Sequence, residues 1–261
     1  MLKPASLSIK AVCSIAVGRD GTPYVGNANG SIHKWDKMNN APLKTLKGHT
    51  GHVLALVIGP EGMVYPGASD CTVKVWSEED GRLIRTLTGH INSITALAVD
   101  TRGRLYSGSV DHTIRVWECG TDTHLKTLTG YSGYPGALAL DQADRLFWAC
   151  GLSIRVWADG VHTQTLNGHT NIITCLAIGM DGTLVSGSLD VRVWSGHSLS
   201  LTRIIRTTSI VLAVAFGPQC DIFSATCDGT ICADRTDGHH LVVPTHPPGG
   251  WFASAVFAPG C

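Results

Sequence analysis

The sequence has few charged residues and no net charge, which argues against one broad class of partner. Lys and Arg number 20, Asp and Glu number 20, and together they make up 15% of the 261 residues. A protein that binds nucleic acid without sequence preference needs an excess of cations, because it must displace counterions from the phosphates. We therefore expect no nucleic-acid partner.

Long apolar runs are also missing. No stretch of 18 consecutive apolar residues occurs, and residues 1–4 lack the apolar core of a signal peptide. The nine cysteines are odd in number and scattered through strand-like positions, among them Cys13, Cys150, Cys175 and Cys232. That usage is typical of reduced thiols and not of a disulfide framework. These features predict a cytoplasmic protein with no membrane partner.

Sustained helical periodicity is absent too, and short β-branched, apolar runs take its place. Between residues 93 and 128 the runs are 93–99, 105–109, 113–117 and 125–128, with turns rich in Gly, Asp and Thr between them. Runs of this length and spacing predict an all-β chain. The 44% of hydrophobic residues can fill a large core.

Tryptophan recurs at a nearly constant interval. The intervals are 41, 41, 40, 37 and 40 residues, and the positions are Trp35, Trp76, Trp117, Trp157, Trp194 and, in place of a sixth Trp, Asp234. A repeat of this length with four short strands per unit is typical of the blades of a β-propeller. The chain is therefore predicted to be a repeat protein.

The chain resembles the WD40 β-propeller family in the strings GHTGHVLALVIG, LYSGSVDHTIRVW, LVSGSLDVRVW and the repeated LKTLTG. The resemblance covers essentially the whole chain. The repeats look most like those of propellers appended to protein kinases and to ubiquitin-ligase substrate receptors. The resemblance implies an all-β, WD40-type propeller as a single domain over residues 1–261, with six complete four-stranded blades.

A partial seventh blade is expected after these six. Residues 251–257 read as its inner strand, so we expect the chain to be truncated within that blade. An unpaired strand edge there would favour self-association. A six-bladed ring with an odd C-terminal strand is the alternative.

Ser, His and Asp recur together in a way that resembles a hydrolase triad. The third repeat has His90, Ser107, Asp111 and Trp117, the fifth has His169, Ser186, Asp190 and Trp194, and the second has His49, Asp70 and Trp76 with Pro66 in the Ser position. An enzyme needs one activated nucleophile, whereas a structural device needs one copy per repeat. The resemblance implies that each set forms a buried hydrogen-bonded chain. We expect no catalytic residue.

The family resemblance also places partners on the face that carries the loops leading into the inner strands and the turns before each Asp of these sets. The candidate partner-binding residues on that face are His52, Tyr134, Ile172, Leu189, Ile210, Leu212 and Trp251. Exposed apolar surface with aromatic anchors is typical of protein-binding patches. The alternative is that several of these side chains plug the central channel. No Arg or Lys occupies the corresponding loop and turn positions of the repeats on this face. This argues against phosphopeptide recognition, because phosphate is bound by clustered Arg side chains.

We therefore expect a non-enzymatic scaffold that binds a peptide or protein segment, with no cofactor and no metal. The alternatives are a substrate-recruiting propeller of a ubiquitin-ligase or kinase assembly, and a hydrolase or isomerase with a site in the channel. One set of soft ligands suits zinc: Cys220, Cys227, Cys232, His239, His240 and His246. Its C-x₆-C-x₄-C spacing matches no paired zinc knuckle.

Overall fold

The computed structural model describes residues 12–36, 38–39, 41–59, 62–121, 123–129, 133, 135–217, 220–234 and 240–244. These residues form 24 β-strands in six sheets, and within them no helix is found that could span a membrane. Each sheet has four strands, which pair in chain order. All neighbouring strands are antiparallel, as expected when short turns connect them.

The strands, sheet by sheet, are β1 Val12–Val17, β2 Pro23–Asn27, β3 Ser31–Asp36 and β4 Ala41–Lys47; β5 Val53–Ile58, β6 Met63–Ala68, β7 Val73–Ser77 and β8 Leu83–Leu87; β9 Ile94–Val99, β10 Arg104–Ser109, β11 Ile114–Glu118 and β12 His124–Leu128; β13 Pro135–Leu140, β14 Leu146–Cys150, β15 Ser153–Ala158 and β16 Val161–Leu166; β17 Cys175–Ile178, β18 Leu184–Gly187, β19 Asp190–Trp194 and β20 Leu201–Arg206; β21 Val211–Phe216, β22 Ile222–Thr226, β23 Thr230–Asp234 and β24 His240–Pro244.

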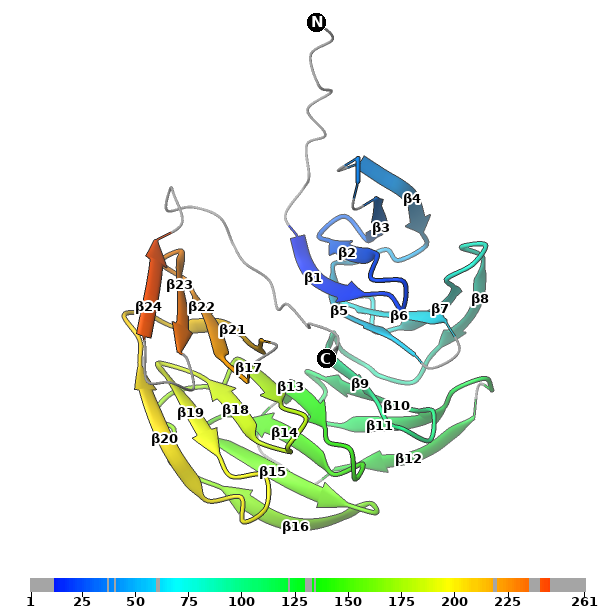
Figure 1. Ribbon diagram of the computed structural model, residues 1–261. Coiled ribbons are helices and arrows are strands. Elements are labelled where there is room, and N and C mark those ends of the chain that lie inside the picture. The colour runs from blue at the N-terminus through cyan, green and yellow to red at the C-terminus, as the bar shows by residue number, and fades with distance from the viewer. Residues whose placement is uncertain are drawn as a thin grey trace, which may run out of the picture.

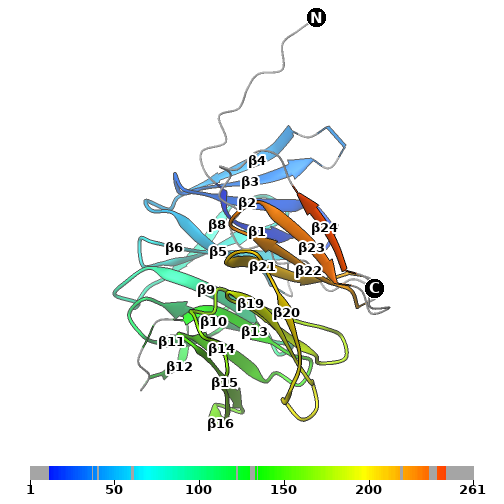
Figure 2. The same cartoon turned by 90° about the vertical axis from the view of Figure 1, so that its left-hand side faces the viewer.

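The six sheets are arranged around a common centre as the blades of a propeller (Figure 1). The first strand of each sheet lies nearest the centre and the fourth lies at the rim, which the side view in Figure 2 also shows for β1 and β4. The inner strands β1, β5, β9, β13, β17 and β21 contact one another in sequence. The prediction of an all-β propeller with six four-stranded blades is confirmed. The expected seventh blade lies outside the described residues.

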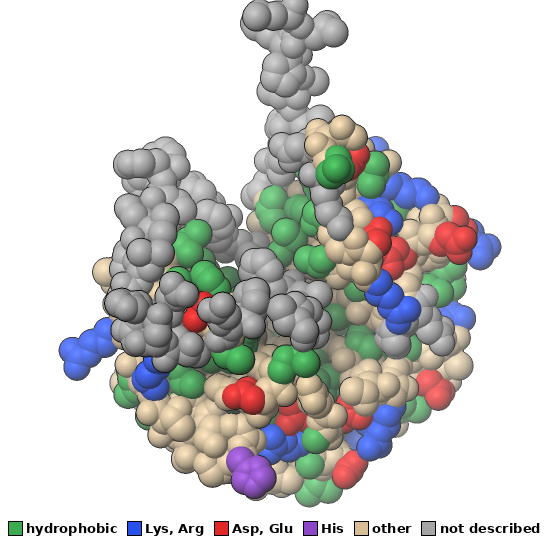
Figure 3. All heavy atoms as spheres, viewed as in Figure 1, with side chains coloured by type: hydrophobic (Ala, Val, Ile, Leu, Met, Phe, Trp, Pro, Cys, Tyr) green, Lys and Arg blue, Asp and Glu red, His purple; other side chains and the backbone are tan. Residues whose placement is uncertain are grey.

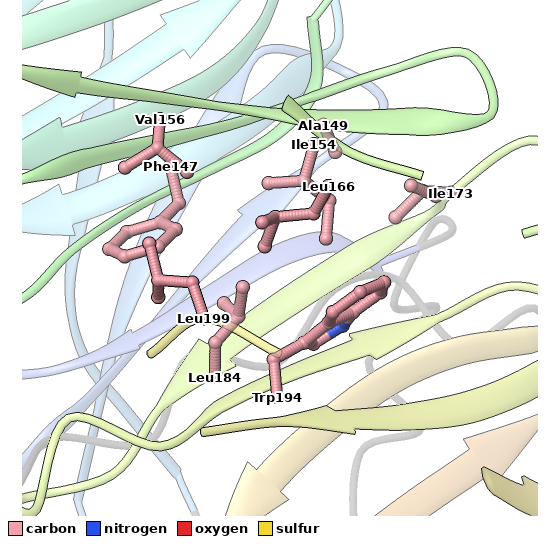
Figure 4. Close-up of a cluster of buried hydrophobic side chains, with 9 residues drawn as sticks. All are labelled: Phe147, Ala149, Ile154, Val156, Leu166, Ile173, Leu184, Trp194 and Leu199. Atoms are coloured by element: carbon pink, nitrogen blue, oxygen red, sulfur yellow. The ribbon is translucent and has the colours of Figure 1, made fainter. Parts of the chain in front are cut away.

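The hydrophobic core is divided into clusters between successive sheets. Between the fourth and fifth sheets, Phe147 and Ile154 face Leu184 and Trp194, and all four side chains are at most 3% exposed (Figure 4). Burying an apolar side chain of this size stabilises the fold by about 2 kcal/mol. Similar clusters join each of the other adjacent pairs from the first sheet to the sixth. Blade-to-blade packing therefore fixes where the connecting loops lie.

The repeated Trp has a structural counterpart in the third strand of five sheets. The pairing between third and fourth strands shifts register at Trp35, Trp76, Trp117, Trp157 and Trp194. In the sixth sheet, where Asp234 replaces Trp, the pairing continues without a shift. A bulge of this kind bends a strand locally and turns its side chain. The Trp period therefore predicts a recurring bulge as well as a recurring strand.

Charged side chains of both signs are interspersed around the rim on the face shown in Figure 3. Among the described residues, Arg104 pairs with Asp100 and Arg145 pairs with Asp141. On this face no single-sign patch of the kind that attracts nucleic acid stands out among the described residues.

Candidate functional site

A continuous hydrogen-bonded chain crosses the third sheet. Trp117 Nε1 donates to Ser107 Oγ at 2.8 Å, and that hydroxyl lies 2.8 Å from His90 Nε2. At the other side of the imidazole ring, Nδ1 lies 2.8 Å from Asp111 Oδ2. Because an ionised carboxylate can only accept, Nδ1 carries the proton and Nε2 accepts from the Ser107 hydroxyl. The chain joins the loop after β8 to the two middle strands, as the family resemblance implies.

Asp111 also holds the turn between β10 and β11. Its carboxylate accepts from the amide of Ile91 at 3.1 Å and from the amide and hydroxyl of Thr113 at 3.0 and 2.6 Å. Burial alone would raise the pKa of Asp111, but the hydrogen bonds from Thr113 and His90 lower it below its usual value. The carboxylate is therefore ionised at neutral pH, and it accepts hydrogen bonds from His90, Ile91 and Thr113.

The second sheet contains the same network with its middle member missing. His49 Nδ1 lies 2.8 Å from Asp70 Oδ2, as in the third sheet. Pro66 has no hydroxyl, and both Trp76 Nε1 and His49 Nε2 are buried without a hydrogen-bond partner. Two buried donors or acceptors without partners cost free energy. The second network therefore has a defect that the third does not have.

The fifth sheet departs from the pattern at the opposite end. Trp194 Nε1 donates to Ser186 Oγ at 2.9 Å, and this hydroxyl lies 2.7 Å from His169 Nε2. His169 Nδ1 is 2.9 Å from Asp190 Oδ1, but the contact is not aligned as a hydrogen bond. Asp190 precedes Trp194 by four residues, whereas Asp111 precedes Trp117 by six. With this shorter turn, Asp190 lies at the start of β19, where it also pairs with Arg192. The prediction of a complete fifth set holds for its residues but not for the last hydrogen bond.

These Ser–His–Asp sets are buried structural links. Ser107 and Ser186 are 0% exposed, and each hydroxyl already accepts from a Trp indole. A catalytic serine has to reach the substrate carbonyl, with an activating base free to take its proton. The burial and the repetition both support the structural role that the sequence predicted.

The buried histidines should make the fold sensitive to mild acid. Burial lowers the pKa of His49, His90 and His169 below the ordinary value of 6.5, and the neighbouring Asp only partly offsets this effect. The unfolded chain then binds protons more readily than the folded chain, so stability is full above pH 6.5 and declines below it. The lowered pKa of Asp111 acts in the same direction, but only near pH 3.8 and below.

We expect the melting temperature to fall between pH 7.5 and pH 5.5, and to fall less steeply in His90→Gln, which can still donate to Asp111. His112 is exposed and serves as the control, because His112→Gln should keep the parental slope. Differential scanning fluorimetry across this pH range checks the prediction. A melting temperature that does not change between pH 7.5 and 5.5 would contradict the neutral, buried histidines.

Several loops and turns meet on the face that the sequence predicted to bind partners. Ile173 donates its amide to the Gly151 carbonyl at 2.9 Å, which joins the loop before the fifth sheet to the β14–β15 turn. Ser188 Oγ donates to the Ile172 carbonyl at 2.9 Å, and the Val211 amide donates to the Ser188 carbonyl at 2.7 Å. The loops of the fourth, fifth and sixth sheets are thus tied into one continuous surface.

Exposed aliphatic side chains gather on these joined loops. Ile172 is 50% exposed, Leu189 45% and Ile210 39%, and all three belong to the residues predicted to bind partners. Leu152 is 51% exposed in the β14–β15 turn, which the Ile173 amide joins through the Gly151 carbonyl. We call these four residues the apolar patch. Contiguous exposed apolar surface on backbone held by hydrogen bonds is typical of a protein-binding site.

Two other predicted partner residues, Leu212 and His52, do not belong to the patch. Leu212 is half-buried on the inner strand β21, and His52 is exposed on the loop before the second sheet. The His52 amide donates to Ser69 Oγ in the β6–β7 turn at 2.8 Å, and the His52 carbonyl accepts from the Ser69 amide at 2.9 Å. Tyr134 and Trp251 lie outside the described residues.

A comparison with protein families bears on the repeats. The WD domain, G-beta repeat family matches residues 40–77, 81–118 and 160–195. The chain is therefore a β-propeller that contains WD40 repeats. Each matched segment runs from the outer strand of one blade through three strands of the next, and these three segments contain the three His–Asp pairs. The comparison with curated proteins found no match.

Leu152 is the one member of the apolar patch that sequence reasoning missed. The family resemblance places the candidate turn positions before the Asp of each repeat, and the fourth repeat has no Asp between Cys150 and Ser153. The hydrogen bond from Ile173 to Gly151 places this turn beside the patch. An alignment by strand order, without the Asp, would have included Leu152.

The possible zinc ligands are not brought together in the described part of the propeller. No group of three or more His, Cys, Asp or Glu there could hold a metal ion. Cys220 and Cys227 are exposed and Cys232 is buried in β23, while His239 and His246 lie outside the described residues.

Proposed function

We propose that this WD40 propeller is a non-enzymatic scaffold that binds an apolar peptide or protein segment across the apolar patch. The observation that carries the proposal is the exposure of Leu152, Ile172, Leu189 and Ile210 on loops that are hydrogen-bonded to one another. WD40 propellers generally serve as protein-interaction scaffolds, which agrees with this role.

The surroundings of the patch favour an apolar partner over a phosphorylated one. Polar groups beside it are used internally: Ser188 Oγ donates to the carbonyls of Asn171 and Ile172, and Thr207 Oγ1 donates to the Leu189 carbonyl. The nearby Arg192 is only 8% exposed and pairs with Asp190. Arg206, which lies opposite Asp190 in the strand pairing, is exposed. Because recognition of phosphate relies on a cluster of Arg side chains, we assign apolar contact as the main attraction.

A non-catalytic role is supported by the use of the Ser, His and Asp side chains inside the blades. A cytoplasmic location is supported by the thiols, since none of the eight described cysteines forms a disulfide. No feature of the described residues favours a ubiquitin-ligase or kinase assembly over other partners, so we propose the scaffold role alone.

The proposal is tested by replacing one patch residue with a charged one. Ile172→Asp should reduce recovery of the proteins that co-purify with the chain at least tenfold, about 1.4 kcal/mol of affinity, because a carboxylate would be desolvated in the interface. Val161→Asp is the matched control, since Val161 is 64% exposed but lies on the outer strand β16. Quantitative mass spectrometry of the co-purified proteins measures both. Equal recovery with the two variants would place binding away from the patch.

A further inference from the structure

The β2–β3 turn has an asparagine at the position where the equivalent turns of the next two sheets have an aspartate. Asn29 stands 41 residues before Asp70, and Asp70 stands 41 residues before Asp111. Asn29 Oδ1 accepts from the Ser31 amide at 3.1 Å and from the Ser31 hydroxyl at 2.7 Å. Asp111 Oδ1 accepts in the same way from the amide and hydroxyl of Thr113, at 3.0 and 2.6 Å. The asparagine side chain is therefore held in the geometry of the carboxylate that it replaces.

The two hydrogen-bond donors on Oδ1 make the Cγ atom of Asn29 more electrophilic. When a nucleophile attacks Cγ, negative charge develops on Oδ1, and donors already aimed at that oxygen stabilise the charge. Because the Ser31 oxygen accepts from Asn27 Nδ2 at 3.3 Å, its own proton is free to point at Asn29. Ser31 is only 5% exposed, whereas Asn29 is exposed to water. The donors are thus fixed by buried contacts, and the side chain that they activate is accessible.

A nucleophile for Cγ is present in the next residue, Gly30. Glycine has no side chain that shields its amide nitrogen, and Gly30 has a φ of 81°, which other residues rarely adopt. The Gly30 amide donates to the Asn27 carbonyl at 3.1 Å. This hydrogen bond must open before the nitrogen can attack, and bonds in turns open locally at a lower cost in free energy than bonds within the core strands.

We propose that Asn29 is a site of self-catalysed deamidation, in which Ser31 stabilises the reacting carbonyl. The Gly30 nitrogen loses its proton and bonds to Asn29 Cγ, and the Cγ–Nδ2 bond breaks to release ammonia. Water then opens the resulting cyclic imide at Cγ, which restores the Gly30 amide and leaves an aspartate at position 29. The net reaction consumes one water and releases one ammonia, and it adds one negative charge to the β2–β3 turn.

The aspartate product fits the turn that the asparagine occupies. A carboxylate at position 29 keeps both hydrogen bonds from Ser31, and these become stronger because the acceptor is charged. Opening of the imide at its other carbonyl would instead give isoaspartate, which adds a carbon to the backbone beside Gly30. A Cβ atom on Gly30 would already lie 2.4 Å from the His49 carbonyl oxygen, so the backbone has no room to shift there. We therefore expect aspartate to be the main product in the folded chain.

The chain contains an internal control, because Asn167 is also exposed and is also followed by a glycine, Gly168. In the part of the chain that the structure describes, no hydrogen bond holds the Asn167 side chain. The whole chain is incubated at mildly alkaline pH, and mass spectrometry of its peptides measures the deamidated fraction at each site. Asn29 should convert about tenfold faster than Asn167 in the folded chain, and at a similar rate in urea, where the contacts of Ser31 are lost.

Two variants of Ser31 test its part in the reaction. Ser31→Ala removes one of the two donors and should slow the conversion of Asn29 about fivefold, whereas Ser31→Thr, which matches Thr113 in the third sheet, should keep the parental rate. Equal rates in these two variants would overturn the proposal, as would isoaspartate as the main product of the folded chain. If Ser31→Ala does not fold, the comparison within the parental chain decides, and a folded-state rate at Asn29 no higher than at Asn167 would refute the proposal.

Discussion

Replacing Asp111 with Ala should lower the free energy of unfolding by about 2–4 kcal/mol, because the buried imidazole of His90 loses its charged acceptor. The Asp111 side chain is 4% exposed and accepts from His90, Ile91 and Thr113. Its loss leaves the buried Nδ1 of His90 and two backbone amides without their acceptor. Chemical denaturation followed by tryptophan fluorescence measures the change.

The matched control is the same substitution in the sixth blade. Asp228 is exposed and accepts from the hydroxyls of Thr208 and Thr226 and from the Thr230 amide, but no histidine depends on it. Asp228→Ala should therefore cost clearly less than Asp111→Ala. Equal losses of unfolding free energy in the two variants would mean that the buried network of the third blade stabilises the fold no more than the exposed Asp228 does.

Replacing Pro66 with Ser should stabilise the chain by about 2 kcal/mol, since it supplies the hydroxyl that two buried groups lack. In the third blade, Ser107 accepts from Trp117 and donates to His90 at the equivalent position. The hydroxyl introduced by Pro66→Ser would restore the same links to Trp76 and His49. The substitution would also return a backbone amide to β6, whose pairing with β7 skips from Val64 to Gly67.

Pro66→Ala separates the two contributions, because it restores the amide without the hydroxyl. Removing a proline also frees the unfolded chain, which works against stability in both variants. The expected order of melting temperatures is Pro66→Ser above both the parent and Pro66→Ala. A Pro66→Ser variant no more stable than Pro66→Ala would show that the orphaned groups of His49 and Trp76 are satisfied in another way.

The sequence predicts the blades well because their periodicity reports local structure. In the third blade the predicted runs 93–99 and 105–109 match β9 and β10 to within one residue at each end. The residues of the buried network recur at matching positions in several repeats, and the family resemblance implies that they form a hydrogen-bonded chain. Both features repeat, and a repeated position is recognised by comparing copies within one chain.

The departures from the repeat depend on tertiary geometry and could not be predicted in the same way. Whether Asp190 aligns with His169 depends on a turn that is shorter in the fifth blade. The membership of Leu152 in the apolar patch depends on a hydrogen bond between two blades. Comparing the repeats within the sequence predicts where a residue lies in its blade. Contacts between blades then determine whether that residue is exposed or hydrogen-bonded.

Site-specific photo-crosslinking at Ile172 tests the central claim most directly. A photoreactive residue placed at position 172 or 189 in the whole chain, and activated in cells, should form adducts with the same partner polypeptide, because the two side chains belong to one patch. The same residue at Val161 on the outer strand should form no such adduct. Adducts from position 161 but not from 172 and 189, or none from any of the three, would contradict the apolar patch as the binding surface.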